Sequence, residues 1–174
     1  MKSRSLVLTA LTLAALPAAA LAQHVASVRT IHEMARNWLV KSAEQMPVAN
    51  YPFKPTPAVR SFGEIIGHVA NANYMFCSIV KGEPSPQTQD FEKVTDRAAL
   101  MKGLNDAFAY CDSAYQLADA QANDQVALPF GNMKGSKLWA LTFNASHNWE
   151  HYGNLVTYFR LKGMVPPSSQ QAGM

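Results

Sequence analysis

Apolar residues recur at every third or fourth position along four separate stretches of the chain, and proline or glycine lies between the stretches. This spacing predicts four amphipathic helices, over residues 25–46, 61–80, 95–118 and 136–162. Four prolines between positions 47 and 57 exclude a helix interior from the first connection. No run of alternating apolar and polar residues predicts a sheet, and the polar segment 121–135 is expected to be a loop. The expected fold is therefore a single all-α four-helix bundle.

Capping residues indicate where these helices begin and end. Ser61 followed by Glu64 is the pattern of a capping box at the start of the second helix. Thr95 and Ser136 can cap the third and fourth helices in the same way. Gly163 occupies the position expected just after the last helical residue.

The first 22 residues have the pattern of a secretory signal peptide. Two basic residues precede an apolar run from Leu6 to Leu16, and Ala20 and Ala22 place small side chains before Gln23. The run is too short to span a bilayer, which needs roughly 20 residues. We therefore predict cleavage before Gln23 and a periplasmic or secreted location. An uncleaved membrane anchor is the alternative.

Cleavage would leave residues 23–174 as one domain, without an internal repeat or a linker that could divide it. The complete chain has a net charge of +3, from 15 basic and 12 acidic residues. Because two of the basic residues lie in the leader, the mature net charge is close to +1. No Lys/Arg cluster remains that could neutralise a row of phosphates. We expect no nucleic-acid partner and, after cleavage, no membrane partner.

Three histidines could meet inside the bundle. His147 and His151 are four residues apart, so they project from one face of the fourth helix about 40° apart. Asn144 and Asn154 share this face and could orient a bound molecule. His68 lies on the apolar face of the second helix, where a buried imidazole needs a partner for each ring nitrogen. These three histidines predict a divalent-metal site with an open position, and satisfied core histidines are the alternative.

The remaining titratable candidates fit the site less well. His24 adjoins the cleavage position, and His32 is expected only to border the pocket. Glu64 could orient a ligand or act as a base, but its place in a capping box is favoured. Glu150 points about 100° away from His151, which favours a solvated or supporting role. The sequence therefore identifies no general base, and three histidines alone do not distinguish zinc, nickel and iron.

Several other kinds of site are unsupported by the residues present. The chain has no CxxCH motif for covalent haem, no pair of Glu-x-x-His motifs for a di-iron centre and no HExxH motif. It also has no GxSxG motif and no phosphate-binding loop. A bis-histidine haem stays open as a minor alternative to the metal ion.

Two segments resemble the DinB/YfiT-like family of small four-helix proteins. Residues 61–69, Ser-Phe-Gly-Glu-Ile-Ile-Gly-His-Val, are similar to the family's second-helix segment that ends in a metal histidine. The HxxxH pair is followed by Gly-Asn-Leu at 153–155, Arg-Leu-Lys-Gly at 160–163 and two prolines, which is similar to the family's fourth-helix pattern. The resemblance covers nearly all of the mature chain.

The resemblance implies an up-down-down-up bundle with a long crossover between the second and third helices. It also implies a metal held by His68, His147 and His151. Members with known activity are similar to thiol-dependent transferases and isomerases. We therefore expect an exported protein that acts on a small molecule, as a metal-dependent hydrolase or a thiol-dependent transferase. The alternative is a non-catalytic periplasmic bundle that binds a metal or ligand, and the sequence leaves a homodimer open.

Cys77 and Cys111 provide a test of this topology. If the second and third helices ran antiparallel, these residues would lie roughly 16 Å apart along the helix axis, too far for a disulfide. In the parallel arrangement that the resemblance implies, they lie nearly level. We therefore predict parallel helices and a Cys77–Cys111 disulfide, formed in an oxidising compartment. Two reduced core cysteines are the alternative.

Overall fold

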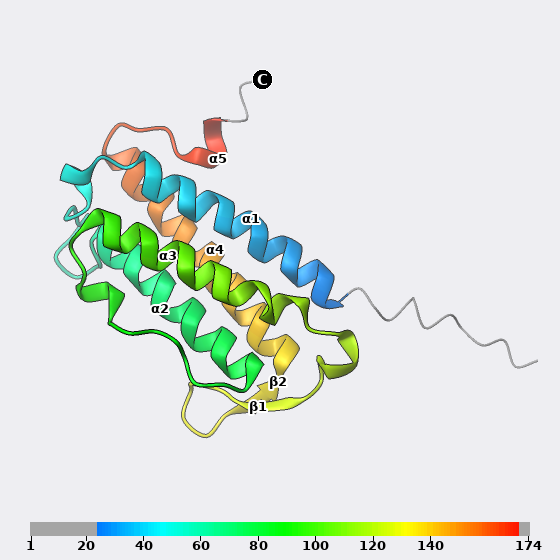
Figure 1. Ribbon diagram of the computed structural model, residues 1–174. Coiled ribbons are helices and arrows are strands. Elements are labelled where there is room, and N and C mark those ends of the chain that lie inside the picture. Colours follow the sequence, from blue (N-terminus) through cyan, green and yellow to red (C-terminus); the bar gives the residue numbers. More distant parts are fainter. Residues whose placement is uncertain (1–23, 171–174) are drawn as a thin grey trace, which may run out of the picture.

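The computed structural model describes residues 24–170, so the predicted leader and its cleavage position lie outside the described residues. Four long helices build the molecule (Figure 1): α1 (His24–Gln45), α2 (Phe62–Lys81), α3 (Arg97–Asp112) and α4 (Lys137–Leu161). Their apolar faces meet in a core of fully buried large side chains that includes Phe62, Leu104 and Phe159. No helix in the described part of the chain is both long enough and apolar enough to cross a membrane.

The helices follow an up-down-down-up order, which confirms the expected topology. In Figure 1, α2 and α3 run side by side in the same direction, and α1 and α4 run the opposite way. Cys77 and Cys111 lie near the C-terminal ends of α2 and α3 and form a disulfide, with their Cα atoms 5.3 Å apart. The parallel arrangement and the predicted disulfide are therefore both confirmed. The crossover between the two helices contains the short 3-10 turn η3 (Phe91–Lys93).

The predicted caps explain most of the helix boundaries. Ser61 Oγ accepts a hydrogen bond from the Glu64 backbone N–H, and the Glu64 carboxylate accepts one from the Ser61 N–H at 2.6 Å. This reciprocal pair is the predicted capping box at the start of α2. Ser136 caps α4 through the Trp139 N–H, as expected. Gly163 has a left-handed φ of 68°, so it ends the last turn where the sequence placed it.

The third helix differs from the prediction at both ends. Its N-cap is Asp96 instead of Thr95, because the Asp96 carboxylate accepts a hydrogen bond from the Ala99 N–H at 2.8 Å. The helix stops at Asp112, short of the predicted 118, and the turns η4 (Ala114–Gln116) and η5 (Asp119–Gln121) follow. In η4, Tyr115 is buried and its hydroxyl donates to the Leu141 carbonyl at 3.0 Å, so a tertiary contact replaces the helical continuation.

A small hairpin occupies the segment that was predicted to be only a loop. Strands β1 (Gln125–Ala127) and β2 (Lys134–Ser136) pair antiparallel, with Val126 opposite Gly135. Each strand has three residues, too few to show an alternating pattern in the sequence. The hairpin connects η5 to α4. The turn at its tip carries Phe130, whose ring centroid lies 5.0 Å from that of Phe143 on α4.

Two further short elements complete the described chain. The 3-10 turn η2 (Val48–Asn50) follows α1 in the proline-containing first connection. The single-turn helix α5 (Pro167–Gln170) lies after the C-terminal end of α4. The Ser168 N–H donates to the Tyr152 hydroxyl at 2.9 Å, which holds this last segment against α4.

Candidate metal centre

The three predicted histidines converge between α2 and α4. His68 comes from the first half of α2, and His147 and His151 come from successive turns of α4. The Nε2 atom of His147 lies 3.1 Å from that of His68 and 3.0 Å from that of His151. One ring nitrogen from each residue falls within a single group whose members are at most 4.8 Å apart. The predicted clustering is therefore confirmed, and the three residues could hold one metal ion.

A carboxylate orients the first of these imidazoles. His68 Nδ1–H donates to Glu92 Oε1 at 2.5 Å, and Arg60 Nε–H donates to the other carboxylate oxygen at 2.9 Å. Burial alone would raise the pKa of the Glu92 carboxyl, but hydrogen bonds from Arg60 and His68 outweigh it and hold that pKa below its usual range. A proton fixed on Nδ1 leaves the Nε2 lone pair of His68 directed at the other two histidines.

The other two imidazoles are kept neutral by their surroundings. Burial lowers the pKa of His147 to about 4, and the neighbouring charges of His68 and Arg60 contribute to the shift. Burial also lowers the pKa of His151 to about 3, with His147, His68 and Arg60 as further causes. The side-chain amide nitrogen of Asn154 lies 3.3 Å from His151 Nδ1. Neutral imidazoles are the form that binds a metal ion.

This donor set fits a divalent transition metal. Three neutral imidazole nitrogens suit zinc, nickel and ferrous iron, whereas calcium and magnesium prefer oxygen ligands. Nε2 separations of 3.0 and 3.1 Å are close to those required by ligands about 2.0–2.1 Å from one ion. Three protein ligands in a four-coordinate site leave one position for a water or a bound molecule.

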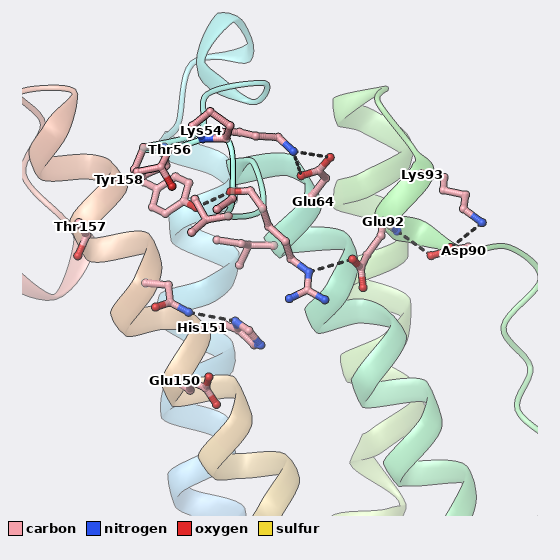
Figure 2. A pocket seen from close by; sticks show the side chains of 17 residues that line it. Lys54, Thr56, Glu64, Asp90, Glu92, Lys93, Glu150, His151, Thr157 and Tyr158 are labelled. Carbon is pink, nitrogen blue, oxygen red and sulfur yellow. Dashed lines mark hydrogen bonds and ion pairs between the residues drawn. The ribbon is translucent and has the colours of Figure 1, made fainter. Parts of the chain in front are cut away.

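A polar cavity of about 930 Å³ opens onto His151. Figure 2 shows His151 pointing from α4 toward α2, with charged side chains above it. These charges form three ion pairs: Lys54 with Glu64, Arg60 with Glu92, and Lys93 with Asp90. Glu64 thus caps α2, as predicted, and it also pairs with Lys54. Glu150 lines the same cavity beside His151.

A second cavity of about 750 Å³, the aromatic groove, opens onto His68 and His147. His68 and His147 line it, together with the three aromatic side chains of Phe76, Phe130 and Phe143 and with polar side chains that include Asn71 and Gln87. Asp90 and Glu92 line both cavities. The three histidines therefore lie between a polar cavity and a groove with an aromatic wall, and this arrangement could not be read from the sequence.

Two residues expected near the site lie elsewhere. His32 is 1% exposed and stacks on Tyr115 with ring centroids 3.8 Å apart, so it belongs to the core and lines neither described cavity. Asn144 donates to Asn73 Oδ1 at 3.0 Å and to the Tyr115 hydroxyl at 3.1 Å. These two hydrogen bonds hold the Asn144 side chain in the core, and Asn144 lines neither described cavity. His24 is exposed at the start of α1.

Glu92 is the functional residue that sequence reasoning missed. It lies 24 residues after His68, on the turn η3 within the crossover. The residues around it show neither helical periodicity nor a known motif spacing. A ligand histidine commonly donates its second ring N–H to a carboxylate. The sequence, however, does not show which of its acidic residues supplies that carboxylate.

Comparisons with known proteins agree with this architecture. A family model described as the DinB superfamily matches residues 31–155, which include all three histidines. The crystal structure of a DinB-like protein from Bacillus cereus ATCC 10987 is similar over 82% of this chain and 93% of that chain, with a TM-score of 0.68. The two sequences are 15% identical, so this likeness shows the fold alone. No curated protein matches the chain.

Proposed function

The chain belongs to the DinB superfamily, and from this membership and the geometry of the histidines we propose that it is an exported, divalent-metal-dependent enzyme acting on a small molecule. The observation that carries the proposal is the convergence of three imidazole nitrogens between two open cavities. His68, His147 and His151 would hold the metal. A bound ion would act as a Lewis acid and lower the pKa of a water or thiol that reaches it.

Open access to the histidines favours catalysis over a purely structural metal site. Structural zinc sites are closed by four protein ligands, whereas catalytic sites keep a position for water or substrate. Among residues 24–170, the group that could hold an ion contains three ligands. Cavities of about 930 and 750 Å³ are within the size range of small-molecule sites.

The disulfide supports the proposed export. Disulfides persist in the periplasm and in secreted proteins and are rare in a reducing cytoplasm. The Cys77–Cys111 bond therefore agrees with the leader pattern of the first 22 residues. An oxidising compartment also favours hydrolysis over transfer to a small thiol, because free thiols are oxidised there.

Metal analysis of the purified mature protein tests the metal centre. We expect the protein to bind close to one equivalent of a divalent transition metal, and His68→Ala and His151→Ala to retain far less than one. His24→Ala is the matched control, because His24 is exposed at the start of α1 and should leave the metal content unchanged. A wild-type protein that binds no zinc, nickel or iron after incubation with each would contradict the proposal.

The proposed export has an independent test. Mass spectrometry of the periplasmic fraction of a producing bacterium should identify a mature N-terminus at Gln23, including its cyclised form. Recovery of the protein with an intact leader in the membrane fraction would show that cleavage does not occur. This experiment does not depend on the metal centre, so either proposal can fail without the other.

A further inference from the structure

The aromatic groove connects directly to the proposed metal centre. His68 and His147 form part of its wall, and their Nε2 atoms lie 3.1 Å apart. A molecule bound through the metal could therefore extend into the groove without crossing a protein barrier. The volume of about 750 Å³ leaves room for an organic group of several carbon atoms.

Three phenylalanines from different elements line this groove. Phe143 lies one helical turn before His147 on α4, and the two rings are nearly parallel, at 22° and 6.4 Å between centroids. Phe76 on α2 and Phe130 on the hairpin turn lie 5.2 and 5.0 Å from Phe143. Aromatic rings at these separations form an apolar wall that favours another ring.

Part of this apolar wall faces solvent. Phe130 is 42% exposed and Met75 on α2 is 37% exposed, and both line the groove. Covering such side chains with an apolar group releases water and contributes to binding. The fold therefore places unburied aromatic and aliphatic surface next to two of the three histidines.

The polar cavity offers a different environment. Its cations Lys54, Arg60 and Lys93 are each paired with a carboxylate, so its charges largely neutralise one another. An anionic group entering there would have to compete with those carboxylates. The aromatic wall of the groove is thus the part of the site that distinguishes one bound molecule from another most directly.

We propose that the site takes a small molecule of two parts, a polar head bound at the three histidines and an aromatic arm that lies in the groove against Phe130 and Phe143. This inference rests on the proposed function, because the head is held by the metal. The hairpin β1–β2 contributes to specificity through Phe130 at its turn. Molecules with the same head but no apolar arm should bind more weakly.

Two hydroxamates provide the test, because they share a metal-binding head and differ in the arm. Benzohydroxamate carries a phenyl ring and acetohydroxamate a methyl group. Titration calorimetry on the zinc-loaded mature protein should show benzohydroxamate binding roughly tenfold more tightly or better, as expected for burial of a ring. The variants Phe130→Ala and Met75→Ala should each reduce this preference severalfold, with little change in acetohydroxamate affinity.

Val59→Ala is the matched control. Val59 is also 42% exposed but lines the polar cavity, so its truncation should leave the preference between the two hydroxamates unchanged. Equal affinities in the wild type, or a preference unaffected by both groove variants, would overturn this inference and leave the metal centre standing. A protein that binds neither zinc nor either hydroxamate would overturn the proposed function and this inference with it.

Discussion

Glu92 connects two side chains that come from different parts of the chain. Its carboxylate accepts hydrogen bonds from His68 at 2.5 Å and from Arg60 at 2.9 Å. The Arg60 backbone carbonyl in turn accepts a hydrogen bond from the Tyr158 hydroxyl on α4. Glu92 therefore positions His68 within a network that joins α2, the crossover and α4.

Removing this carboxylate should weaken metal binding while leaving all three ligands in place. We expect Glu92→Ala to reduce zinc affinity by about 10- to 100-fold, the usual effect of losing a partner behind a ligand histidine. The zinc affinity of Glu92→Gln should lie between those of the wild type and Glu92→Ala, because the amide oxygen of Gln can still accept a hydrogen bond from His68 Nδ1–H. Competition with a chelator measures the affinities. Glu150→Ala removes a carboxylate that lines the same cavity and should have a smaller effect than Glu92→Ala.

His32 is a buried histidine outside the proposed metal centre. Burial, with a smaller contribution from the Arg36 charge, lowers its pKa to about 3. In the unfolded chain the pKa of histidine is about 6.5. The unfolded state therefore binds a proton below pH 6.5, and the folded state does not until about pH 3. It follows that stability is fully present above pH 6.5 and falls as the pH decreases.

The contribution of His32 can be isolated by replacing it with a neutral polar residue. Between pH 7.5 and pH 5, the wild type should lose about 2 kcal/mol more of its unfolding free energy than His32→Gln. Urea unfolding of both proteins at the two pH values, with chelator present, measures this difference. The three site histidines are present in both proteins and cancel in the comparison. Equal losses in the two proteins would show that His32 takes up a proton in the folded state over the same pH range as in the unfolded state.

Among the elements, the contact between α2 and η3 brings Glu92 to His68. Gly67, the residue before His68, allows this approach. A Cβ atom at position 67 would lie 2.2 Å from the Phe91 carbonyl oxygen and 2.7 Å from the Glu92 nitrogen. Because both are backbone atoms, the turn would have to move away from the helix. The absence of a side chain at Gly67 is thus a structural requirement for the contact between Glu92 and His68.

A methyl group at this position should separate η3 from α2. We expect Gly67→Ala to lower the free energy of unfolding by about 1–3 kcal/mol through overpacking, and to weaken zinc binding because Glu92 moves away. Gly153→Ala on α4 is the matched control, since nothing lies within 4 Å of its added Cβ. That control should be neutral or stabilising by up to about 1 kcal/mol. Urea midpoints and zinc competition distinguish the two variants.

In the molecule as a whole, the disulfide joins the two parallel helices that the crossover connects. Cys77 and Cys111 are 34 residues apart in sequence, and the closed loop contains the crossover with η3. The helices α2 and α3 run in the same direction (Figure 1), and the bonded cysteines lie near the C-terminal ends of both. In the unfolded chain, the cross-link restricts the crossover between α2 and α3. In the folded protein this crossover has to return along the length of a helix.

Loss of this cross-link should destabilise the protein substantially. For a loop of this length we expect the double variant Cys77→Ala/Cys111→Ala to lose about 3–4 kcal/mol of unfolding free energy. Reductant should lower the unfolding free energy of the wild type by a similar amount and leave that of the double variant unchanged. Urea unfolding with and without reductant measures both values. Thiol titration of the denatured, unreduced wild type should detect no free thiol. Two titratable thiols would contradict the disulfide.

Features that depend on a few neighbouring residues could be predicted from the sequence. The capping box of Ser61 and Glu64 forms within one turn of helix, and the HxxxH spacing places His147 and His151 on one face of α4. The apolar periodicity was enough to predict four helices and to place His68 toward the interior. Together with the family resemblance, these local patterns predicted the bundle, its topology and the three clustered histidines.

Features that depend on contacts between distant segments could not be predicted in the same way. Glu92 meets His68 only because a turn of the crossover packs against Gly67, and Phe130 lines the groove only because the hairpin folds back beside α4. His32 and Asn144 join a core network instead of the site because Tyr115 and Asn73 reach them there. A local pattern specifies which face of a helix is apolar. Packing between segments far apart in the sequence decides which loop covers that face, and no short sequence pattern predicts it.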